Sequence, residues 1–471
     1  MQNTSLQFKH NTAKALKNET LQKTMANSRG GLTLKRAKAV SKTPKFEALR
    51  DSAREIKENV LENLDLYLEE FEHNVIENGG HVHWAQTASE ARGHIVDICR
   101  KTNAKTVTKG KSMISEEIEL NDFLEQSGIK TIETDLGEYI VQLRGETPSH
   151  IIAPAVHLSM DQVRQTFLKN HKKLKADRDL QTPESLLLEA RAILREQFLK
   201  SDIGITGANF LVAETGTSVI VTNEGNGDLT QVLPRVHVVI ASIEKIVPNL
   251  EDMSQLLRVL ARSATGQKMS VYNTLSTGSK RADDADGPEE YHVILLDNGR
   301  SNMLGTEFHE MLRCIRCGAC MNHCPVYQNV GGHAYGSLYT GPMGSVLTPA
   351  LVGIDTAKHL PNASTFCGRC EEVCPVKIPL PKMMRNWRER EFEKHLSPKA
   401  QRRNLKLWAY LAKRPFLYRR ATQIASFGMR MFSLNKGHSR YLPFAGQWTK
   451  HRQMPTPVQK TFMQQYNKKR R

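Results

Sequence analysis

The chain has 471 residues, enough for two to four domains at roughly 150 residues each. Its hydrophobic fraction of 39% and charged fraction of 24% are ordinary for globular proteins, which excludes a fully disordered chain or a bundle of membrane helices. The formal net charge of +17 predicts attraction to an anionic partner, whether nucleic acid, acidic lipid or an acidic protein surface.

Cysteine usage and the lack of long apolar runs indicate the compartment. No stretch of about 18 uninterrupted apolar residues occurs, and the start, MQNTSLQFKHNTAKALKNET, lacks the apolar core of a secretory signal. Seven of the 8 cysteines crowd into two short clusters, which favours metal binding over disulfides in a chain that is not exported. We therefore expect a cytoplasmic protein.

The first part of the chain divides at about residue 42. Residues 1–42 are rich in Lys, Asn and Thr and show no clear apolar period, which predicts a basic, mobile N-terminal arm. From residue 43 onward, apolar residues from Phe46 to Leu64 recur at gaps of three and four, the pattern of an amphipathic helix. Gly79 and Gly80 are expected to end this helical region.

Strand-like and helix-like segments then alternate as far as Leu296. HVHWA, KTVTKG and IKTIET read as strands, ASEARGHIVDICRK and SEEIELNDFLEQSG read as helices, and the apolar runs HIIAPAV and HVVIASI follow. This alternation predicts an α/β domain, and the nearly continuous apolar strands fit a parallel sheet covered on both faces. We assign residues 43–298 to the N-terminal helix and this α/β domain.

Two loops of the α/β domain suit an anionic substrate. Lys109-Gly110-Lys111-Ser112 follows a strand; Lys105 stands where a nucleotide-binding loop needs glycine, but two lysines at a helix start can still bind an anion. Residues 204–231 pack small polar residues between apolar strands, and Glu214 is the first residue to test there. A solvated loop and tight hairpins are the structural alternatives.

Cys99 and His237 lie among apolar residues, Cys99 near Ile95 and Ile98 and His237 inside the run VHVVI. Both side chains are common in protein interiors. We expect both in the hydrophobic core rather than at a site.

The strongest motif is Cys314-Ile-Arg-Cys317-Gly-Ala-Cys320-Met-Asn-His-Cys324-Pro325. Its C-x2-C-x2-C-x3-C-P spacing is typical of bacterial two-cluster ferredoxins, in which the fourth cysteine binds the other cluster. Zinc also uses C-x2-C pairs, but in two separated pairs rather than at triplet spacing. The motif therefore predicts iron-sulfur clusters, within a ferredoxin-type domain over residues 299–385.

A second motif reads Ser364-Thr-Phe-Cys367-Gly-Arg-Cys370-Glu-Glu-Val-Cys374-Pro375, with serine in the place of the first cysteine. By the exchange of fourth cysteines, the first [4Fe-4S] cluster takes Cys314, Cys317, Cys320 and Cys374. The second cluster takes Cys324, Cys367 and Cys370.

The fourth corner of the second cluster stays open at this point. A [4Fe-4S] cluster with Ser364 or another non-cysteine ligand, one with an open iron, and a [3Fe-4S] cluster all fit three cysteines. Arg316, Arg369 and Lys377 lie near the ligands in the sequence and should favour the reduced, more negative state.

The final region, residues 386–471, reads as helical and basic, with aromatic residues such as Trp408 and Phe416 among Arg and Lys. Such a tail can bind nucleic acid, anionic lipid or a partner subunit. We favour a partner or a membrane surface over nucleic acid, because an electron carrier needs a docking face.

The pairing of CIRCGACMNHCP with CGRCEEVCPVKIP, after an α/β region that contains KGKSM and GITGANFLVAETGT, resembles the lactate utilization protein B family over nearly the whole chain. The resemblance implies a lactate-utilization α/β domain of the ribose-phosphate isomerase and CoA-transferase type. It implies that an α-helical ferredoxin-like two-cluster domain and a basic helical tail follow. The second motif of that family also lacks its leading cysteine, so Ser364 is no departure.

The resemblance also implies a function. Family members act with two companion proteins, a cysteine-rich redox protein and a protein with a second copy of the α/β domain, to oxidise L-lactate to pyruvate without nicotinamide. We therefore predict a non-catalytic or co-catalytic electron-transfer component of an L-lactate oxidoreductase complex, which passes electrons toward an acceptor such as the respiratory pool. The resemblance supplies no catalytic residue.

Two other functions stay open. The α/β domain could itself bind and turn over an anionic substrate at Lys109, Lys111 and residues 204–231. Alternatively, the chain is a cluster-bearing nucleic-acid-binding protein, which predicts strongly salt-dependent binding.

Overall fold

The computed structural model describes residues 3–175, 177–433, 437–439, 441, 446–449 and 452–469. The chain forms two compact units, Met1–Glu391 and Phe392–Arg471. The first unit contains the α/β domain and all the cysteines. No helix in the described part of the chain is long and apolar enough to cross a membrane.

The first unit is built around a six-stranded parallel sheet with the strand order β1-β10-β7-β4-β2-β3. The strands are β1 (His81–Ala85), β2 (Thr106–Gly110), β3 (Lys130–Glu133), β4 (Ile203–Gly207), β7 (Val236–Ser242) and β10 (Glu290–Leu296). The helices between them are α5 (Ala88–Lys101), α6 (Met113–Glu117), α7 (Leu120–Gln126), α8 (Leu136–Arg144), α9 (Met160–Asn170), α10 (Pro183–Leu199) and α11 (Asn226–Val232). This arrangement confirms the α/β class with parallel strands.

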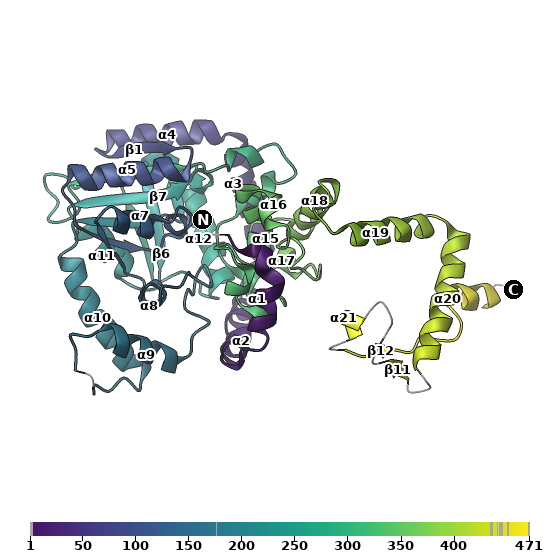
Figure 1. Ribbon diagram of the computed structural model, residues 1–471. Coiled ribbons are helices and arrows are strands. Elements are labelled where there is room, and N and C mark those ends of the chain that lie inside the picture. Colours follow the sequence, from purple (N-terminus) through teal and green to yellow (C-terminus); the bar gives the residue numbers. More distant parts are fainter. Residues whose placement is uncertain are drawn as a thin grey trace. The chain divides into compact units, whose positions relative to one another are not determined.

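Both faces of the central sheet are covered, with α5 and α4 (Leu64–Glu77) on opposite faces (Figure 1). Successive side chains of a strand point to opposite faces. In β7, Ile240 therefore packs in one buried cluster with Ile95 of α5, whereas Val239 packs in another with Phe71 of α4. Because neither face meets water, β7 is apolar along nearly its whole length.

A smaller mixed sheet has the strand order β8-β5-β6-β9. Its strands are β5 (Phe210–Val212), β6 (Thr217–Thr222), β8 (Ile246–Val247) and β9 (Tyr272–Ser276), and α12 (Leu250–Ala264) follows β8. Strands β5 and β6 form an antiparallel hairpin through the turn η2 (Ala213–Thr215). Residues 204–231 thus contain a tight hairpin, as the structural alternative predicts, and also loops that reach a cavity described below.

The described part of the N-terminal arm is helical and packs against the cysteine segment. It forms η1 (Ser5–Gln7), α1 (Phe8–Ala15) and α2 (Glu19–Ser41), before α3 (Phe46–Glu62). Met25 is 2% exposed and shares a buried cluster with Cys324. This packing differs from the loose arm that the sequence predicts, because its few apolar residues contact a distant segment instead of forming a helical stripe of their own.

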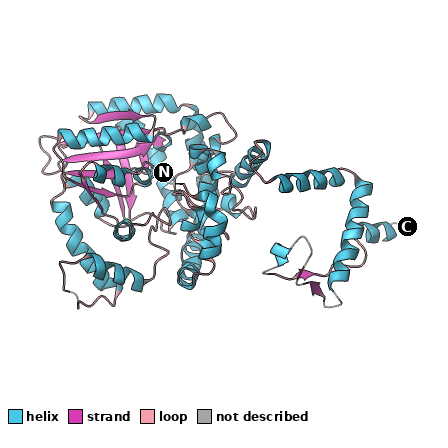
Figure 2. Cartoon of the chain, viewed as in Figure 1, coloured by secondary structure: helices cyan, strands magenta, loops and turns pink. Residues whose placement is uncertain are grey.

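The segment after β10 contains only helices and turns up to the end of the first unit (Figure 2). Its α-helices are α13 (Ala319–Asn322), α14 (Tyr327–Val330), α15 (Gly341–Val352), α16 (Ile354–Ala357), α17 (Arg369–Glu372) and α18 (Leu380–Glu393). Short 3-10 turns are η3 (Ile243–Lys245) in the α/β domain and η4 (Ser301–Met303), η5 (His309–Arg313) and η6 (His333–Tyr335) here. The cysteines lie on the shortest of these elements and the loops between them.

The second unit contains α19 (Lys399–Ala412), α20 (Pro415–Ser433), α21 (Gly446–Thr449) and α22 (Phe462–Lys469), with short strands β11 (His438–Ser439) and β12 (Met454–Pro455). No residue of α19 is buried, and Trp408 and Phe416 are 62% and 68% exposed. These helices therefore present apolar side chains among basic ones.

Candidate functional site

The two cysteine motifs have the same backbone conformation at equivalent positions. In the first motif, Arg316 and Gly318 have φ values of 57° and 70°, and α13 begins directly after the glycine. In the second, Phe366 and Gly368 have φ values of 55° and 80°, and α17 begins directly after the glycine. Non-glycine residues rarely adopt positive φ, so this repeat is specific. Ser364 therefore occupies the structural place that the first cysteine has in the other motif.

Four thiols converge on one apolar cavity. Cys314, Cys317 and Cys320 of the first motif line it together with Cys374 of the second. We call these four residues the first thiol group. The apolar wall around them is formed by Ile151, Met311, Ile315, Met343, Val376, Ile378 and Leu380.

The surroundings of the first thiol group fit an iron-sulfur cluster. Burial, and after it the neighbouring Cys317 and Cys314, raises the pKa of Cys320 well above that of a free thiol. Such thiols stay protonated unless a cation offsets the charge of the thiolate. The backbone N–H of Ile378 also donates a hydrogen bond to Cys374 Sγ at 3.4 Å, the kind of contact that tunes cluster potentials.

Cys324, Cys367 and Cys370 form a second thiol group. Cys324 and Cys370 are buried, whereas Cys367 is exposed. Burial, and then the neighbouring Cys324, raises the pKa of Cys370 to about 12. Cys370 also lies close enough to Cys320 of the first group to affect its pKa. These three thiols fit a cluster whose fourth corner is not a cysteine.

Two hydroxyl groups are candidates for the fourth position of this cluster. Ser364 stands at the motif position of the missing cysteine, and Tyr335 lies beside Cys324 in the structure. Ser364 Oγ accepts the N–H of Phe366 at 3.1 Å. Tyr335 is fully buried beside Cys324, and its hydroxyl has no hydrogen-bond partner of ordinary geometry in the described part of the chain. Burial, and then Cys324, raises the pKa of Tyr335, so the hydroxyl stays protonated. Because a buried hydroxyl without an acceptor is costly, the sulfur of Cys324 is its natural acceptor at this site.

A buried ionic network lies between the sheet and the first thiol group. Arg300 pairs with Glu117 at 2.7 Å and with Glu244 at 3.1 Å, and all three side chains are 0–1% exposed. Glu244 also pairs with Arg316 at 3.1 Å. Burial favours the neutral acid, but the charges of Arg300 and Arg316 outweigh it and lower the pKa of Glu244 to about 2. The network fixes Arg316 beside Cys314, and no sequence motif marks it.

The three basic residues that the sequence analysis placed near the ligands each have an acidic partner. Arg316 pairs with Glu244, Arg369 with Glu372, and Lys377 with Asp51. Since each partner cancels much of the positive charge, these residues should favour the reduced state less than their sequence positions predict.

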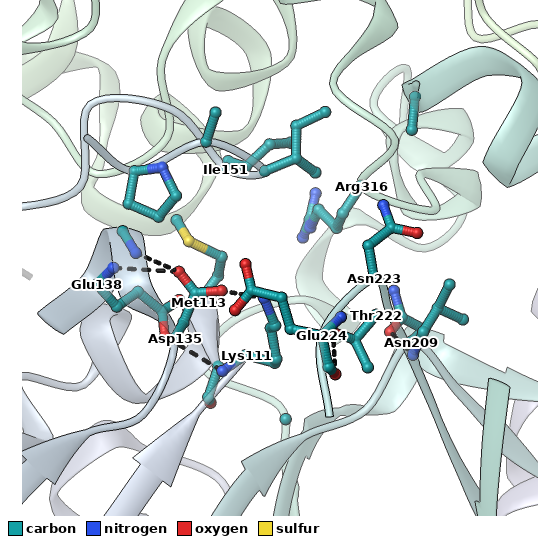
Figure 3. Close-up of a pocket in the computed structure, with 18 of the residues that line it drawn as sticks. Lys111, Met113, Asp135, Glu138, Ile151, Asn209, Thr222, Asn223, Glu224 and Arg316 are labelled. Carbon is teal, nitrogen blue, oxygen red and sulfur yellow. Dashed lines mark hydrogen bonds and ion pairs between the residues drawn. The ribbon is translucent and has the colours of Figure 1, made fainter. Parts of the chain in front are cut away.

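A larger cavity of about 470 Å³ adjoins the first thiol group. Ile151 and Arg316 line both cavities, and Figure 3 shows them across the larger one from Lys111 and Asp135. Its polar lining includes Lys111, Asp135, Glu138, Asn209, Asn223 and Glu224. The fold therefore brings the Lys111 loop and the loops of residues 204–231 together, as an anion site would require.

Two residues expected at this site lie elsewhere. Lys109 is 1% exposed, and its Nζ pairs with Glu116 at 2.7 Å and with Glu133 at 2.6 Å, away from the cavity. Glu214 lies in the hairpin turn η2, where its Oε2 accepts the N–H of Leu250 at 3.3 Å. The structure therefore corrects both assignments, because the alternation of β2 turns Lys109 inward and the hairpin carries Glu214 away.

Two acidic residues of the cavity, Asp135 and Glu138, were missed by the sequence analysis, whereas Glu224 belongs to the predicted segment 204–231. Burial, and then the charge of Asp135, raises the pKa of both Glu138 and Glu224. Lys111 forms an ion pair with Asp135 and donates its backbone N–H to Glu138 at 3.2 Å. The position of Asp135 just after β3 was the available signal, because polar groups at the carboxyl ends of parallel strands commonly form sites.

Cys99 and His237 are core residues, as predicted. Both are 1% exposed. Cys99 packs in the same buried cluster as Ile95, and Nε2 of His237 hydrogen-bonds with Thr206 Oγ1 at 2.9 Å. Neither belongs to a site described above.

Comparison with known protein families finds two matches, one in the α/β domain and one in the cysteine segment. Residues 68–296 match the LUD domain family, and residues 310–378 match the 4Fe-4S dicluster domain family. The second match confirms an iron-sulfur domain in the cysteine segment.

Curated relatives extend the likeness over the whole chain. Lactate utilization protein B of Bacillus licheniformis is 43% identical over 466 residues, which are 98% of this chain and 97% of the relative. Lactate utilization protein B of Bacillus subtilis (strain 168) is 43% identical over 97% of this chain and 95% of its own. The Escherichia coli (strain K12) protein named uncharacterized electron transport protein YkgF is 43% identical over 88% of this chain and 86% of its own. The chain therefore belongs to the lactate utilization protein B family.

Proposed function

We propose that this protein is the iron-sulfur electron-transfer subunit of an NAD-independent system that oxidises L-lactate to pyruvate during growth on lactate. The observation that carries the proposal is the grouping of seven thiols in two sites inside one helical segment. The names of the relatives, lactate utilization protein B and electron transport protein, support the process and the role.

The proposed ligands follow the two thiol groups. Cys314, Cys317, Cys320 and Cys374 hold one [4Fe-4S] cluster, supported by their convergence on one cavity. Cys324, Cys367 and Cys370 hold a second cluster, either [4Fe-4S] with a non-cysteine fourth ligand or [3Fe-4S], supported by their mutual proximity. Such clusters, when bound, carry one electron at a time.

Oxidation of lactate releases two electrons and two protons, so a partner must take the electron pair and this chain must receive single electrons in sequence. The residues of the chain position the thiols, surround the first group with apolar side chains and leave the second group open at Cys367. This gradient from enclosed to exposed suits transfer toward an acceptor at the surface, such as the respiratory pool.

The proposed partners are the companion lactate-utilization subunits, a cysteine-rich redox protein and a second protein with the α/β domain. The exposed apolar side chains Trp408, Tyr410 and Phe416 among the basic residues of α19 and α20 support a docking role for the second unit. A peripheral contact with the respiratory membrane would use the same charge.

Anaerobically purified protein tests the proposal. We expect about seven to eight irons per chain and two electron paramagnetic resonance signals, and reduction of both by L-lactate only when the companion subunits are present. Reduction of a dye by lactate and the purified chain alone would contradict a relay-only role, and an iron content near zero would contradict the clusters.

A second function is favoured by the large cavity. We propose, as the alternative, that the α/β domain binds a small carboxylate or phosphate at Lys111, Asn209 and Asn223. Glu138 and Glu224, with raised pKa values, can donate hydrogen bonds to such an anion in their protonated forms.

Calorimetric titration of the holoprotein with L-lactate, pyruvate and inorganic phosphate tests this alternative. Affinity should fall as pH rises through the raised pKa of Glu224, because the ionised carboxylate repels the anion. Glu224→Gln should remove that part of the pH dependence and tighten binding at high pH by about fivefold, which corresponds to about 1 kcal/mol. No binding of any of the three anions would exclude this second function.

A further inference from the structure

A third cavity of about 420 Å³ lies on the side of the first unit where the N-terminal helices meet the connection between α8 and α9. Its lining includes Glu146 and His157 of that connection and His333 of the cysteine segment. One potential metal-ligand atom from each of these three residues lies within 4.8 Å of the other two. Neither thiol group contributes to this cavity.

Glu146 presents one carboxylate oxygen toward the two histidines. Arg144 occupies its Oε1, with Nε at 2.9 Å and Nη2 at 2.7 Å. Its Oε2 lies 2.8 Å from Nε2 of His157. The arginine therefore orients the carboxylate and leaves Oε2 as the free donor atom.

Ser149 orients the ring of His157. Ser149 Oγ lies 2.8 Å from Nδ1 of His157 and 2.9 Å from the carbonyl oxygen of Pro154, which also accepts the backbone N–H of Ser149 at 3.0 Å. Nε2 of His157 faces the carboxylate of Glu146, and it offers a lone pair to an ion in the tautomer that carries the ring proton on Nδ1.

The rings of His157 and His333 lie 4.5 Å apart between centroids, so a ring nitrogen of each can reach one ion.

His333 is oriented in the same way. Its Nε2 lies 2.7 Å from the carbonyl oxygen of Thr147, so Nε2 carries the proton and Nδ1 carries the lone pair. Each of the three side chains thus has an outer partner, namely Arg144, Ser149 and the Thr147 carbonyl. Outer partners of this kind orient the ligands of protein metal sites.

We propose that Glu146, His157 and His333 bind a divalent transition-metal ion, separate from the iron-sulfur clusters. Two imidazoles and one carboxylate suit zinc and its neighbours in the first transition series better than magnesium or calcium, which prefer oxygen ligands. Three protein ligands leave at least one coordination position open to the cavity.

The position of the site gives the metal a structural role. Glu146 and His157 flank the connection that leads from α8 to α9, and His333 belongs to η6, two residues before the buried Tyr335. A bound ion would join the α/β domain to the segment that carries the second thiol group. This role does not depend on the identity of the substrate or the acceptor.

Zinc titration of the anaerobic holoprotein, after removal of loosely bound metal with a weak chelator, tests the site. We expect one Zn²⁺ per chain, with X-ray absorption that shows nitrogen and oxygen neighbours and outer-shell scattering from imidazole. His333→Ala should weaken binding by more than the roughly 10- to 100-fold that loss of an outer partner costs. His333 is exposed and forms no ion pair within the described residues, so this variant should fold.

Two matched measurements keep the test decisive. His73→Ala, at an exposed position of α4, should bind zinc like the parent protein, and the iron content should be unchanged in both variants. Sulfur neighbours around zinc, unchanged affinity in His333→Ala, or no zinc binding at micromolar concentration would each overturn the proposal. The last result would leave an ion pair between His157 and Glu146 as the whole function of the cluster.

Discussion

The two thiol groups share one motif but have different surroundings. The first group, with Cys374 taken from the other motif, lies in an apolar cavity backed by a buried ionic network and a pocket of about 470 Å³. The second has three thiols, one of them exposed, and a buried tyrosine, Tyr335, whose hydroxyl lies beside Cys324. The first group therefore has an apolar wall and adjoins the α/β domain, whereas the second reaches the surface at Cys367.

The largest expected effect separates the groups by their ligands. Cys374→Ala should remove the same cluster signal as Cys314→Ala, although the two residues belong to different motifs, because both line one cavity. Each change should lower the iron content by about four per chain, measured by iron analysis and electron paramagnetic resonance. Cys367→Ala should remove the other signal.

Cys99→Ala is the control for these variants, because Cys99 is buried in a core cluster of the sheet that contains none of the seven motif cysteines. It should leave both signals intact. Loss of the second signal, instead of the first, in Cys374→Ala would show that the ligands do not cross between motifs and would remove the basis of the comparison.

The next effect concerns the ion pairs that lie near each thiol group. Arg300→Met removes the ion pair of the buried Glu117 and leaves the buried Glu244 with Arg316 as its partner, and it should destabilise the folded protein by about 3–5 kcal/mol. Arg369→Met, at an exposed pair with Glu372 beside the second group, should cost at most about 1 kcal/mol. Thermal unfolding of the two anaerobic holoproteins measures the difference.

The lower melting temperature of Arg300→Met should be accompanied by earlier loss of the first cluster signal. Equal melting temperatures for the two variants would indicate that the network contributes no more than a surface ion pair. The insulation of the first group would then depend on its apolar wall alone.

Sequence reasoning predicted what is local and periodic. The parallel sheet follows from short apolar strands that alternate with helices, and the cysteine spacing is itself a local signal for iron-sulfur binding. The partners of Arg300 could not be predicted, because Glu117 and Glu244 are distant in the chain and become neighbours only when the sheet is complete. The same reason explains why Lys109 was placed at the anion site: its inward direction depends on the register of β2.

The smallest effect concerns the fourth corner of the second group. Tyr335→Phe keeps the ring in its core position and removes only the hydroxyl beside Cys324. A hydrogen bond to sulfur favours the reduced, more negative state, so its loss should lower the potential of the second cluster. A net hydrogen bond of about 1 kcal/mol corresponds to about 40 mV for a one-electron couple.

Redox titration followed by electron paramagnetic resonance measures both clusters in one sample. Tyr327→Phe is the matched control, because Tyr327 lies in the same buried cluster but its hydroxyl already donates to the Ser149 carbonyl at 2.8 Å. It should leave both potentials unchanged, and Tyr335→Phe should leave the first unchanged. If Tyr335→Phe instead abolished the second signal, the tyrosine would be a ligand rather than a hydrogen-bond donor, and the open corner would be closed by a residue that neither motif contains.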